Sequence, residues 1–507
     1  MNYSKLKLSI SWILVFFLIS SCTEQLQPKE EVQTKVMNEP LRVCEDNPRY
    51  FSDADGKAIY LTGAHTWNIL SDMSRISKTA KSGGPSLSEI DFKNHQPKSL
   101  DFVAYFDYLE DFHHNFIRMW TWETWAFNCP ANSHWGGGGR MHVWPHPYAR
   151  TGPGEALDGR PKFDLTKYDQ EYFNRLRSRV EEAGKRGIYV SVMLFEGWGI
   201  YGDPEAKETH PYNSANNING INGDPNGDGK LYETHQLVEK KITALQEAYV
   251  RKVIETVNDL DNVLYEIANE DGPGASIKEW QYHMVNFVKE TESTKPNQHP
   301  VGMTPFFGDK AGLKALFESP ADWISPASWG GEEWAKGRLY KYDPPANDGR
   351  KVIFTDTDHL WGIGATVHWV WASFTRGLQP IFMDPYDAGL YGYNPFEPKY
   401  RNINLAMGDT RRFAERMNLT AMTPHSDLAT SKYCLADPGN EYFAYLPNVE
   451  NGKVTIDLRA VEGQLAVEWF NPYTRETADG GQVDGGAPRT LVSPFGEAMA
   501  LVYLRRE

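Results

Sequence analysis

Two acidic segments of the sequence could perform acid–base chemistry. An apolar run over 263–268 ends in Asn269 and Glu270, and a later apolar run ends in Asp356 and Asp358. Cleavage of a glycosidic bond needs a proton donor at the leaving oxygen and a second carboxylate across the sugar ring. We therefore predict that Glu270 is the general acid/base and that Asp356 is its partner, with Asp358 as the alternative.

Each acidic pair also has a structural interpretation. An Asn-Glu pair can simply start a surface loop, and an Asp pair can cap the following helix. The position of both pairs favours chemistry, because polar groups at the carboxyl ends of barrel strands face the substrate. Strand alternation points Asp356 and Asp358 to the same side. Asn269 could hydrogen-bond the sugar hydroxyl beside the reacting carbon.

Other polar and aromatic residues follow further strand-like runs. We expect them to bind substrate, and they are His65, Trp67, Arg118, Trp120, Trp122, Glu196, Trp329, His359 and Asp384. Arg118 could keep the partner carboxylate ionised through a charge-assisted bond, or form a structural salt bridge. The tryptophan rings offer flat faces to sugars, although any one of them could equally belong to the core.

The elements that must position these residues alternate along the chain. From Tyr50 onward, β-branched and aromatic runs alternate with stretches of helical apolar spacing. The eight expected strands are 59–65, 115–120, 188–194, 263–268, 301–304, 323–325, 352–355 and 380–383. This count predicts an α/β fold with a closed (βα)8 TIM barrel. An open doubly wound sheet would want an early Gly-rich phosphate loop, which the sequence lacks.

The chain divides into a barrel and a small second domain. We assign residues 45–420 to the catalytic barrel and 421–507 to an all-β sandwich, because short strands with turns replace the helical pattern there. Two long loops, Cys129–Lys162 and Ile200–Glu233, follow barrel strands and should wall off the cleft. A walled cleft mildly favours exo action over endo action.

The start of the sequence predicts export and lipidation. Residues 1–21 combine Lys5 and Lys7 with a short apolar run, and small residues then precede Cys22. This pattern is typical of a lipoprotein signal peptide, after which Cys22 would be acylated. Residues 22–44 read as a polar tether. We expect an outer-membrane lipoprotein on the periplasmic side or the cell surface, anchored to the membrane at Cys22.

Charge and cysteine content exclude several classes of function. The formal charge is −15, and it becomes −17 when Lys5 and Lys7 are lost with the leader. An acidic chain without a basic block is a poor nucleic-acid binder. Cys44, Cys129 and Cys434 are far apart and form no CxxC pair, which argues against a disulfide framework or a zinc site. We expect a monomer that binds carbohydrate.

One loop resembles the start of a calcium-binding loop. Oxygen ligands Asp224, Asn226 and Asp228 occupy positions one, three and five, and Gly229 occupies position six. Position twelve departs from the pattern, because His235 replaces the bidentate glutamate. A structural Ca²⁺ is therefore one interpretation and a solvated turn is the other. No cofactor is required for the expected chemistry.

Together, these motifs resemble the clan A glycoside hydrolases. The hairpin leading into Gly63–Trp67, the Asn269-Glu270 pair and the acidic end of the seventh strand carry the likeness. The opening and the tail, with Val467–Thr474 and Ala498–Leu504, are most similar to the apiosidase-like (DUF4038-type) branch. Members of that branch join a barrel to a C-terminal β-domain named for collagen binding, and we expect this domain to brace the barrel.

The resemblance implies a retaining glycosidase with Glu270 as acid/base and a nucleophile on strand seven. This sequence offers Asp356 where members usually carry glutamate, and the shorter side chain could widen the gap between the carboxyl groups. Retention wants about 5–5.5 Å and inversion about 6.5–9.5 Å. The expected substrates are plant or microbial polysaccharides and oligosaccharides. The alternatives are an inverting or endo-acting glycanase and a non-catalytic glycan-binding lipoprotein.

Overall fold

The computed structural model describes residues 39–76, 90–129, 139–203, 205–306, 312–327, 339–447 and 452–506. Its centre is a sheet of eight strands in the order β4-β16-β15-β14-β13-β12-β11-β6, paired in parallel. The strands are Gly63–His65 (β4), Phe116–Met119 (β6), Tyr189–Glu196 (β11), Val263–Asn269 (β12), Val301–Met303 (β13), Trp323–Ile324 (β14), Val352–Asp356 (β15) and Gln379–Met383 (β16). The predicted TIM barrel is confirmed.

The first and last strands of the sheet meet through the segments that precede them. The Asn115 amide donates to the Thr62 carbonyl at 3.0 Å, and the Thr62 amide donates to the Asn115 side chain at 3.0 Å. Gly63 is required at this junction, because a Cβ there would lie 2.0 Å from the Phe116 carbonyl oxygen. The sheet therefore closes on itself, and the carboxyl ends of all eight strands gather at one rim.

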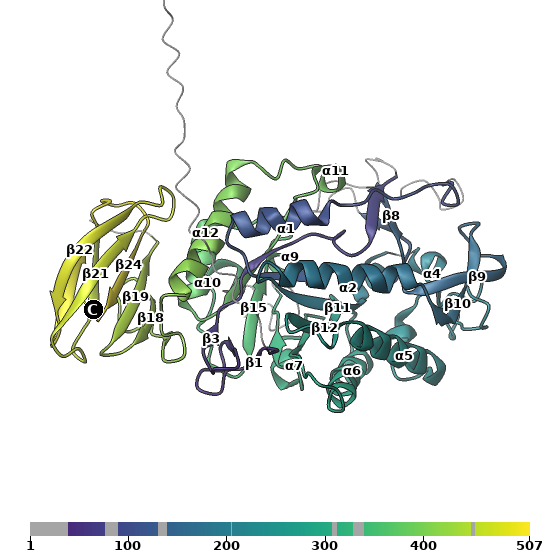
Figure 1. The fold of residues 1–507 in the computed structure, drawn as a ribbon, viewed down its shortest axis with the longest axis horizontal. Coiled ribbons are helices and arrows are strands. Elements are labelled where there is room, and N and C mark those ends of the chain that lie inside the picture. The colour runs from purple at the N-terminus through teal and green to yellow at the C-terminus, as the bar shows by residue number, and fades with distance from the viewer. Residues whose placement is uncertain are drawn as a thin grey trace, which may run out of the picture. The chain divides into compact units, whose positions relative to one another are not determined.

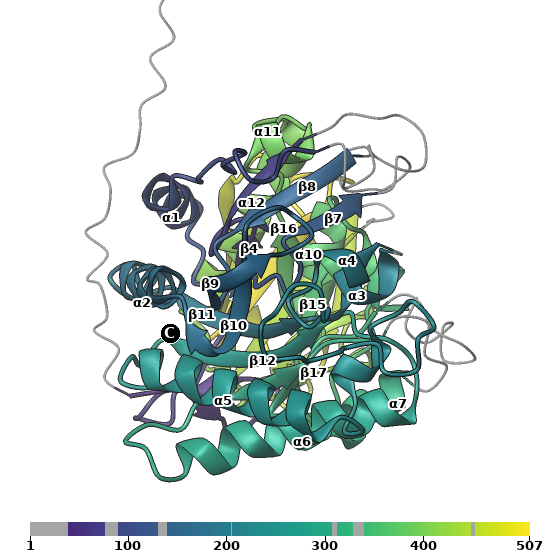
Figure 2. The ribbon, with the colours of Figure 1, turned by 90° about the vertical axis from the view of Figure 1, so that its right-hand side faces the viewer.

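Helices follow the strands and surround the sheet (Figure 2). They bury one apolar face each, as α5 does with Ile242, Val250 and Val253. The principal helices are α1 (Phe102–Asp111), α2 (Gln170–Gly184), α5 (Lys240–Val257), α6 (Ala275–Glu292), α7 (Gly312–Glu318), α10 (Val367–Thr375) and α12 (Pro398–Ala414). Among the residues that the structure describes, no helix is both long and apolar enough to cross a membrane.

The first long loop is more regular than its composition suggested. Within the expected loop Cys129–Lys162, the chain forms β8, β9 and the start of β10. The strands in this region are β5 (Asp72–Arg75), β7 (Ala126–Cys129), β8 (Gly139–Trp144), β9 (Tyr148–Glu155) and β10 (Pro161–Tyr168). β8 pairs with β5 and β7, whereas β9 and β10 form a hairpin. The glycines and prolines in this segment therefore mark turns between strands.

The second long loop is held by asparagine side chains. The Asn217 amide donates to the carbonyls of Pro211, Asn213 and Ile221 at 2.8–3.1 Å. Such bonds replace the backbone ladder that a regular element would provide. The short helices of this region are α3 (Gly197–Gly202), α4 (Ala206–Thr209) and the 3-10 helix η2 (Tyr232–His235).

Two antiparallel sheets follow the barrel, as predicted (Figure 1). The larger has the order β17-β18-β19-β24-β21-β22 and the smaller pairs β20 with β23. Their strands are β17 (Thr423–Pro424), β18 (Tyr433–Asp437), β19 (Glu441–Leu446), β20 (Lys453–Asp457), β21 (Gln464–Phe470), β22 (Thr477–Asp484), β23 (Pro488–Val492) and β24 (Ala500–Arg505). The domain boundary near residue 421 stays a prediction.

The central strands of the larger sheet, β19 and β24, are buried on both faces. Phe443 and Tyr503 belong to the apolar core of the barrel, where the Phe443 ring stacks on Trp371 of α10 at 6.0 Å. Their neighbours Ala444 and Val502 face the other way and share a core with the smaller sheet. This alternation is what the two-residue period of a strand requires.

The N-terminal part of the fold begins earlier than expected. Leu41 and Cys44 are buried, and the strand β1 (Arg42–Val43) pairs with β2 (Phe51–Ser52). Residues 41–44 therefore belong to the folded body, which corrects the predicted tether of 22–44. The predicted hairpin is present, because β2 also pairs with β3 (Ala58–Ile59). Cys44, Cys129 and Cys434 are buried free thiols, whereas Cys22 and the predicted signal peptide lie outside the described residues.

Candidate active site

The guanidinium of Arg118 organises the carboxyl rim of the barrel. Arg118 extends from β6 and is 1% exposed. Its Nε donates to Glu266 at 2.8 Å and its Nη2 donates to Asn269 at 2.6 Å. Its Nη1 donates to Asp356 at 2.6 Å and, more weakly, to Asp358 at 3.3 Å. Residues from strands two, four and seven therefore meet at one buried guanidinium. Burying this charge is unfavourable by itself, and the surrounding carboxylates compensate for the cost.

The carboxylate of Asp356 accepts three hydrogen bonds. It receives the Arg118 bond, a 3.1 Å bond from His65 Nε2 and a 2.9 Å bond from the backbone amide of Asp358. Trp120 donates to His65 Nδ1 at 2.9 Å, which leaves the ring proton on Nε2. Burial opposes the charged form, but His65 and Arg118 hold the pKa of Asp356 below its ordinary value. Asp356 is therefore an ionised anchor whose oxygens are occupied.

Asp358 and Glu270 face each other. One carboxylate oxygen of Asp358 lies within 4.8 Å of one carboxylate oxygen of Glu270. A ring nitrogen of His359 lies within 4.8 Å of both oxygens. Burial and the nearby Asp356 raise the pKa of Asp358 to about 6. Burial, followed by Asp358 and Glu196, raises the pKa of Glu270 well above its ordinary value. The two carboxyls therefore take different protonation states near neutral pH, as a paired acid and base require.

The segment after Asp356 does not continue as a strand. Asp356 ends β15, and its side chain caps the short helix α9 (Thr357–Leu360) by accepting from the Asp358 amide. The turn into α9 separates the two aspartates, so that Asp358 reaches Glu270 while Asp356 points to Arg118. The alternation argument therefore does not apply beyond Asp356, although both side chains still contact Arg118 Nη1, at 2.6 and 3.3 Å.

Asn269 and His359 form a neutral pair beside the carboxyls. His359 Nε2 donates to Asn269 Oδ1 at 3.0 Å, and Ser325 donates to His359 Nδ1 at 2.8 Å. Burial and Arg118 lower the pKa of His359 well below its ordinary value, so the ring is neutral. Among the described residues, no partner meets the buried Asn269 Nδ2. That amide N–H is available to a bound hydroxyl.

The remaining predicted residues lie at other strand ends. Glu196 ends β11, caps α3 at Gly199, and has a pKa that burial raises well above its ordinary value. Asp384 follows β16 and accepts from Tyr108 at 3.1 Å and Asn404 at 2.9 Å. Trp329 lies outside the described residues.

The predicted tryptophan platforms pack against one another. Trp120 stacks on Trp122 at 5.5 Å, and Trp122 stacks on Phe127 at 4.1 Å. Trp67 contacts both tryptophans and Tyr391, and all three tryptophans are at most 4% exposed. Their faces are covered by aromatic neighbours, so the geometry gives them a packing role at the cleft, and stacking on a sugar stays a prediction.

In the loop that resembles a calcium-binding loop, protein groups already occupy the oxygens of Asp224. Asp224 accepts from the backbone amides of Asp228 and Gly229 at 3.0 and 3.1 Å and pairs with Lys207 at 2.5 Å. The Lys207 bond lowers the pKa of Asp224. Position twelve, His235, is buried beneath the loop between two other carboxylates. The Ca²⁺ site stays a prediction.

Glu266 was not predicted as a site residue. It lies in the middle of β12 and is fully buried, with both oxygens on Arg118. A glutamate inside an otherwise apolar strand was the available signal, because a buried charge needs a partner of opposite sign.

One family model matches part of the sequence. Residues 140–304 match a family model described as a domain of unknown function (DUF6298), a stretch that includes Glu270 but ends before Asp356. No curated protein matches the sequence. The apiosidase-like branch and the type of the C-terminal domain therefore stay predictions.

Several solved structures share the architecture. One titled "Glycoside hydrolase" has a TM-score of 0.54 at 11% identity, covering 92% of this chain and 97% of its own. A glycoside hydrolase family 5 structure from Bacteroides vulgatus gives 0.54 at 12%, covering 92% and 93%. A further structure from the same organism, titled "putative glycoside hydrolase", gives 0.53 at 12%, covering 93% and 83%. At these identities the likeness establishes a shared fold, that of a TIM barrel also used by glycoside hydrolases.

Proposed function

We propose that this protein is a retaining glycoside hydrolase. The observation that carries the proposal is the Glu270–Asp358 pair, with oxygens within 4.8 Å across the mouth of a barrel. A gap of at most 4.8 Å is much shorter than the roughly 6.5–9.5 Å of inverting enzymes and closer to the roughly 5–5.5 Å of retaining ones. The solved structures with the same fold include glycoside hydrolases, which supports this reaction class.

The two carboxyls divide the reaction between them. Protonated Glu270 gives its proton to the glycosidic oxygen as that oxygen leaves, and ionised Asp358 forms a bond to the anomeric carbon. Glu270, now ionised, then takes a proton from water, whose oxygen displaces Asp358 from the sugar. We assign the nucleophile to Asp358, although the sequence favoured Asp356, because the oxygens of Asp356 are engaged by Arg118, His65 and a backbone amide.

The neighbouring groups support these roles. Arg118 and His65 hold Asp356 ionised, and its negative charge helps to raise the pKa of Asp358. Asn269 presents its amide N–H beside Glu270, where a sugar hydroxyl would lie. His359 is fixed as a neutral ring by Ser325 and adds no charge to the cleft.

The substrate and location form part of the proposal. We assign the substrate to plant or microbial polysaccharide fragments, with exo action and a place in the apiosidase-like branch. A lipid anchor at Cys22 would hold the enzyme at the outer membrane. These assignments rest on sequence motifs, and the long segments after β6 and β11 support a walled cleft.

A substrate screen with matched variants tests the proposal. The wild-type protein is incubated with aryl glycosides and plant polysaccharides, and released sugar is measured. Glu270→Gln should lower turnover by about 10²–10⁴-fold, the usual contribution of an acid/base group. The control is Glu318→Gln on the surface of α7, whose partner Lys314 is exposed. Equal turnover by wild type and Glu270→Gln, or binding of glycans without any hydrolysis, would contradict the proposal.

A further inference from the structure

Glu270 adopts a backbone conformation that needs support. Its φ is +47°, in the left-handed region that side chains other than glycine seldom occupy. Such a conformation persists only where the surroundings impose it. The direct contact of the Glu270 amide, with Thr304 Oγ1 at 3.4 Å, is long. The restraint must therefore come largely from the residues on either side.

The following residue, Asp271, is fixed by several groups. Its Oδ1 accepts from His235 Nδ1 at 3.0 Å and from the Gly272 amide at 2.8 Å, while its Oδ2 accepts from Gln281 at 3.2 Å. The first residue of α3 lies directly against it, because a Cβ on Gly197 would lie 2.4 Å from the Asp271 Cα. Asp271 thus has little freedom to move, and neither does the peptide that joins it to Glu270.

His235 bridges two carboxylates, that of the buried Asp271 and that of Glu123, whose side chain is 13% exposed. Its Nε2 lies 2.9 Å from Glu123 Oε2 and its Nδ1 lies 3.0 Å from Asp271 Oδ1. Because carboxylates here accept on both sides, both ring nitrogens donate and the ring is a cation. The ring also stacks on Trp280 at 4.2 Å and 7°. Burial opposes the charged form, but Asp271 and Glu123 raise the pKa of His235 to about 10.

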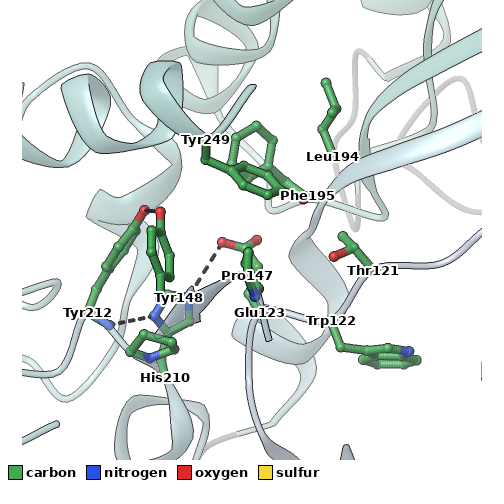
Figure 3. Close-up of a pocket in the computed structure, with 11 residues that line it drawn as sticks. Thr121, Trp122, Glu123, Pro147, Tyr148, Leu194, Phe195, His210, Tyr212 and Tyr249 are labelled. Carbon is green, nitrogen blue, oxygen red and sulfur yellow. Dashed lines mark hydrogen bonds and ion pairs between the residues drawn. The ribbon is translucent and has the colours of Figure 1, made fainter. Parts of the chain in front are cut away.

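Glu123 connects the bridge to the other strands. It follows β6, and its Oε2 also accepts from the backbone amide of Glu196 at 3.0 Å. Its Oε1 lies 3.5 Å from His210, beside a cavity of about 20 Å³ (Figure 3). The bridge therefore joins the ends of strands two, three and four, and its histidine lies two residues beyond the long loop Ile200–Glu233.

We propose that His235 is a positioning residue that holds Glu270 in its left-handed conformation through Asp271 and Glu123. This inference rests on the proposed acid/base role of Glu270. The bridge touches neither facing carboxyl, so its effect is on where Glu270 places its proton. A misplacement of about 1 Å can cost about 10²-fold in rate.

Leaving groups of different basicity test the inference. A basic leaving group needs the proton from Glu270, whereas an activated dinitrophenolate departs without it. For His235→Gln, we expect kcat/KM to fall about 100-fold on a glycoside with a basic leaving group and less than 5-fold on the dinitrophenyl glycoside. Asp271→Asn should show the same pattern. The control is His283→Gln, a partly exposed histidine paired with Glu247 on the helix surface.

Each outcome has a distinct meaning. Equal losses on both substrates, or none, would overturn the positioning role while leaving the hydrolase intact, provided that Glu270→Gln is inactive. If the wild-type protein hydrolyses no glycoside, the proposed function fails. Crystal structures of wild type and His235→Gln then test the positioning role by itself. We expect the φ of Glu270 to leave the left-handed region in the variant, and an unchanged Glu270 would refute the inference.

Discussion

Replacing Asp356 and Asp358 one at a time by asparagine should separate stability from turnover. Asp356 accepts from Arg118 at 2.6 Å, His65 at 3.1 Å and the Asp358 amide at 2.9 Å. An asparagine offers one acceptor, and its NH₂ would oppose a donor. Breaking a buried ion pair of this kind costs about 3–5 kcal/mol. We expect Asp356→Asn to lower the free energy of unfolding by that amount and to retain measurable turnover where folded.

Asp358→Asn should behave in the opposite way. The folded-state pKa of about 6 lies above the ordinary value of 3.8, so ionisation of Asp358 reduces stability as pH rises through this interval. At pH 7 the asparagine removes that unfavourable charge, and its loss of contact with Arg118 concerns a bond of 3.3 Å. We expect a free energy of unfolding equal to or above that of wild type, with turnover reduced to the detection limit.

Urea unfolding at pH 7 and initial rates on the best aryl glycoside measure the two effects. Asp348→Asn, an exposed aspartate paired with Arg350, serves as the control for both assays. The reasoning is refuted if Asp356→Asn is stable but inactive while Asp358→Asn turns substrate over. That result would identify Asp356 as the nucleophile.

Three further measurements test other parts of the structure. The pH profile of kcat/KM should lose activity below pH 6 as Asp358 is protonated and again on the alkaline side as Glu270 ionises; a flat profile from pH 4 to 9 would contradict the pairing. Gly197→Ala should lower the free energy of unfolding by about 1–3 kcal/mol in urea titrations, because its Cβ would collide with Asp271; a change within 0.5 kcal/mol would contradict the close approach. Calcium at about 100 times its Kd should stabilise the protein by about 2.7 kcal/mol if the 224–233 loop binds it, whereas equal melting temperatures in calcium and in chelator would remove the site.

The fold could be predicted because its signals are local. Each barrel strand is an apolar run of strand-forming residues, and each helix has its own apolar stripe. The segment 129–162 was misjudged because its glycines and prolines signal turns without saying that β8 and β9 lie between them. Residues 41–44 were misjudged because their pairing with β2 depends on a partner further along the chain.

The site was predicted only as far as strand ends could indicate it. Glu270 and the acidic end of β15 follow from position in the barrel. The choice between Asp356 and Asp358 depends on where β15 ends and α9 begins. Asp356 is the last residue of the strand and Asp358 already belongs to the helix, a boundary that the sequence pattern does not define. The bridge through His235 was not foreseen, because its carboxylates, Glu123 and Asp271, come from segments that are distant in the sequence.

The strand order of the larger C-terminal sheet has a consequence for synthesis on the ribosome. β24 lies between β19 and β21, although it follows both in the chain by about 30 residues or more. Until residues 500–505 have left the exit tunnel, these two strands have no common neighbour, and Phe413 of α12 lacks its ring contact with Tyr503 of β24. Nascent chains halted before this point should therefore be the ones that chaperones retain and proteases degrade.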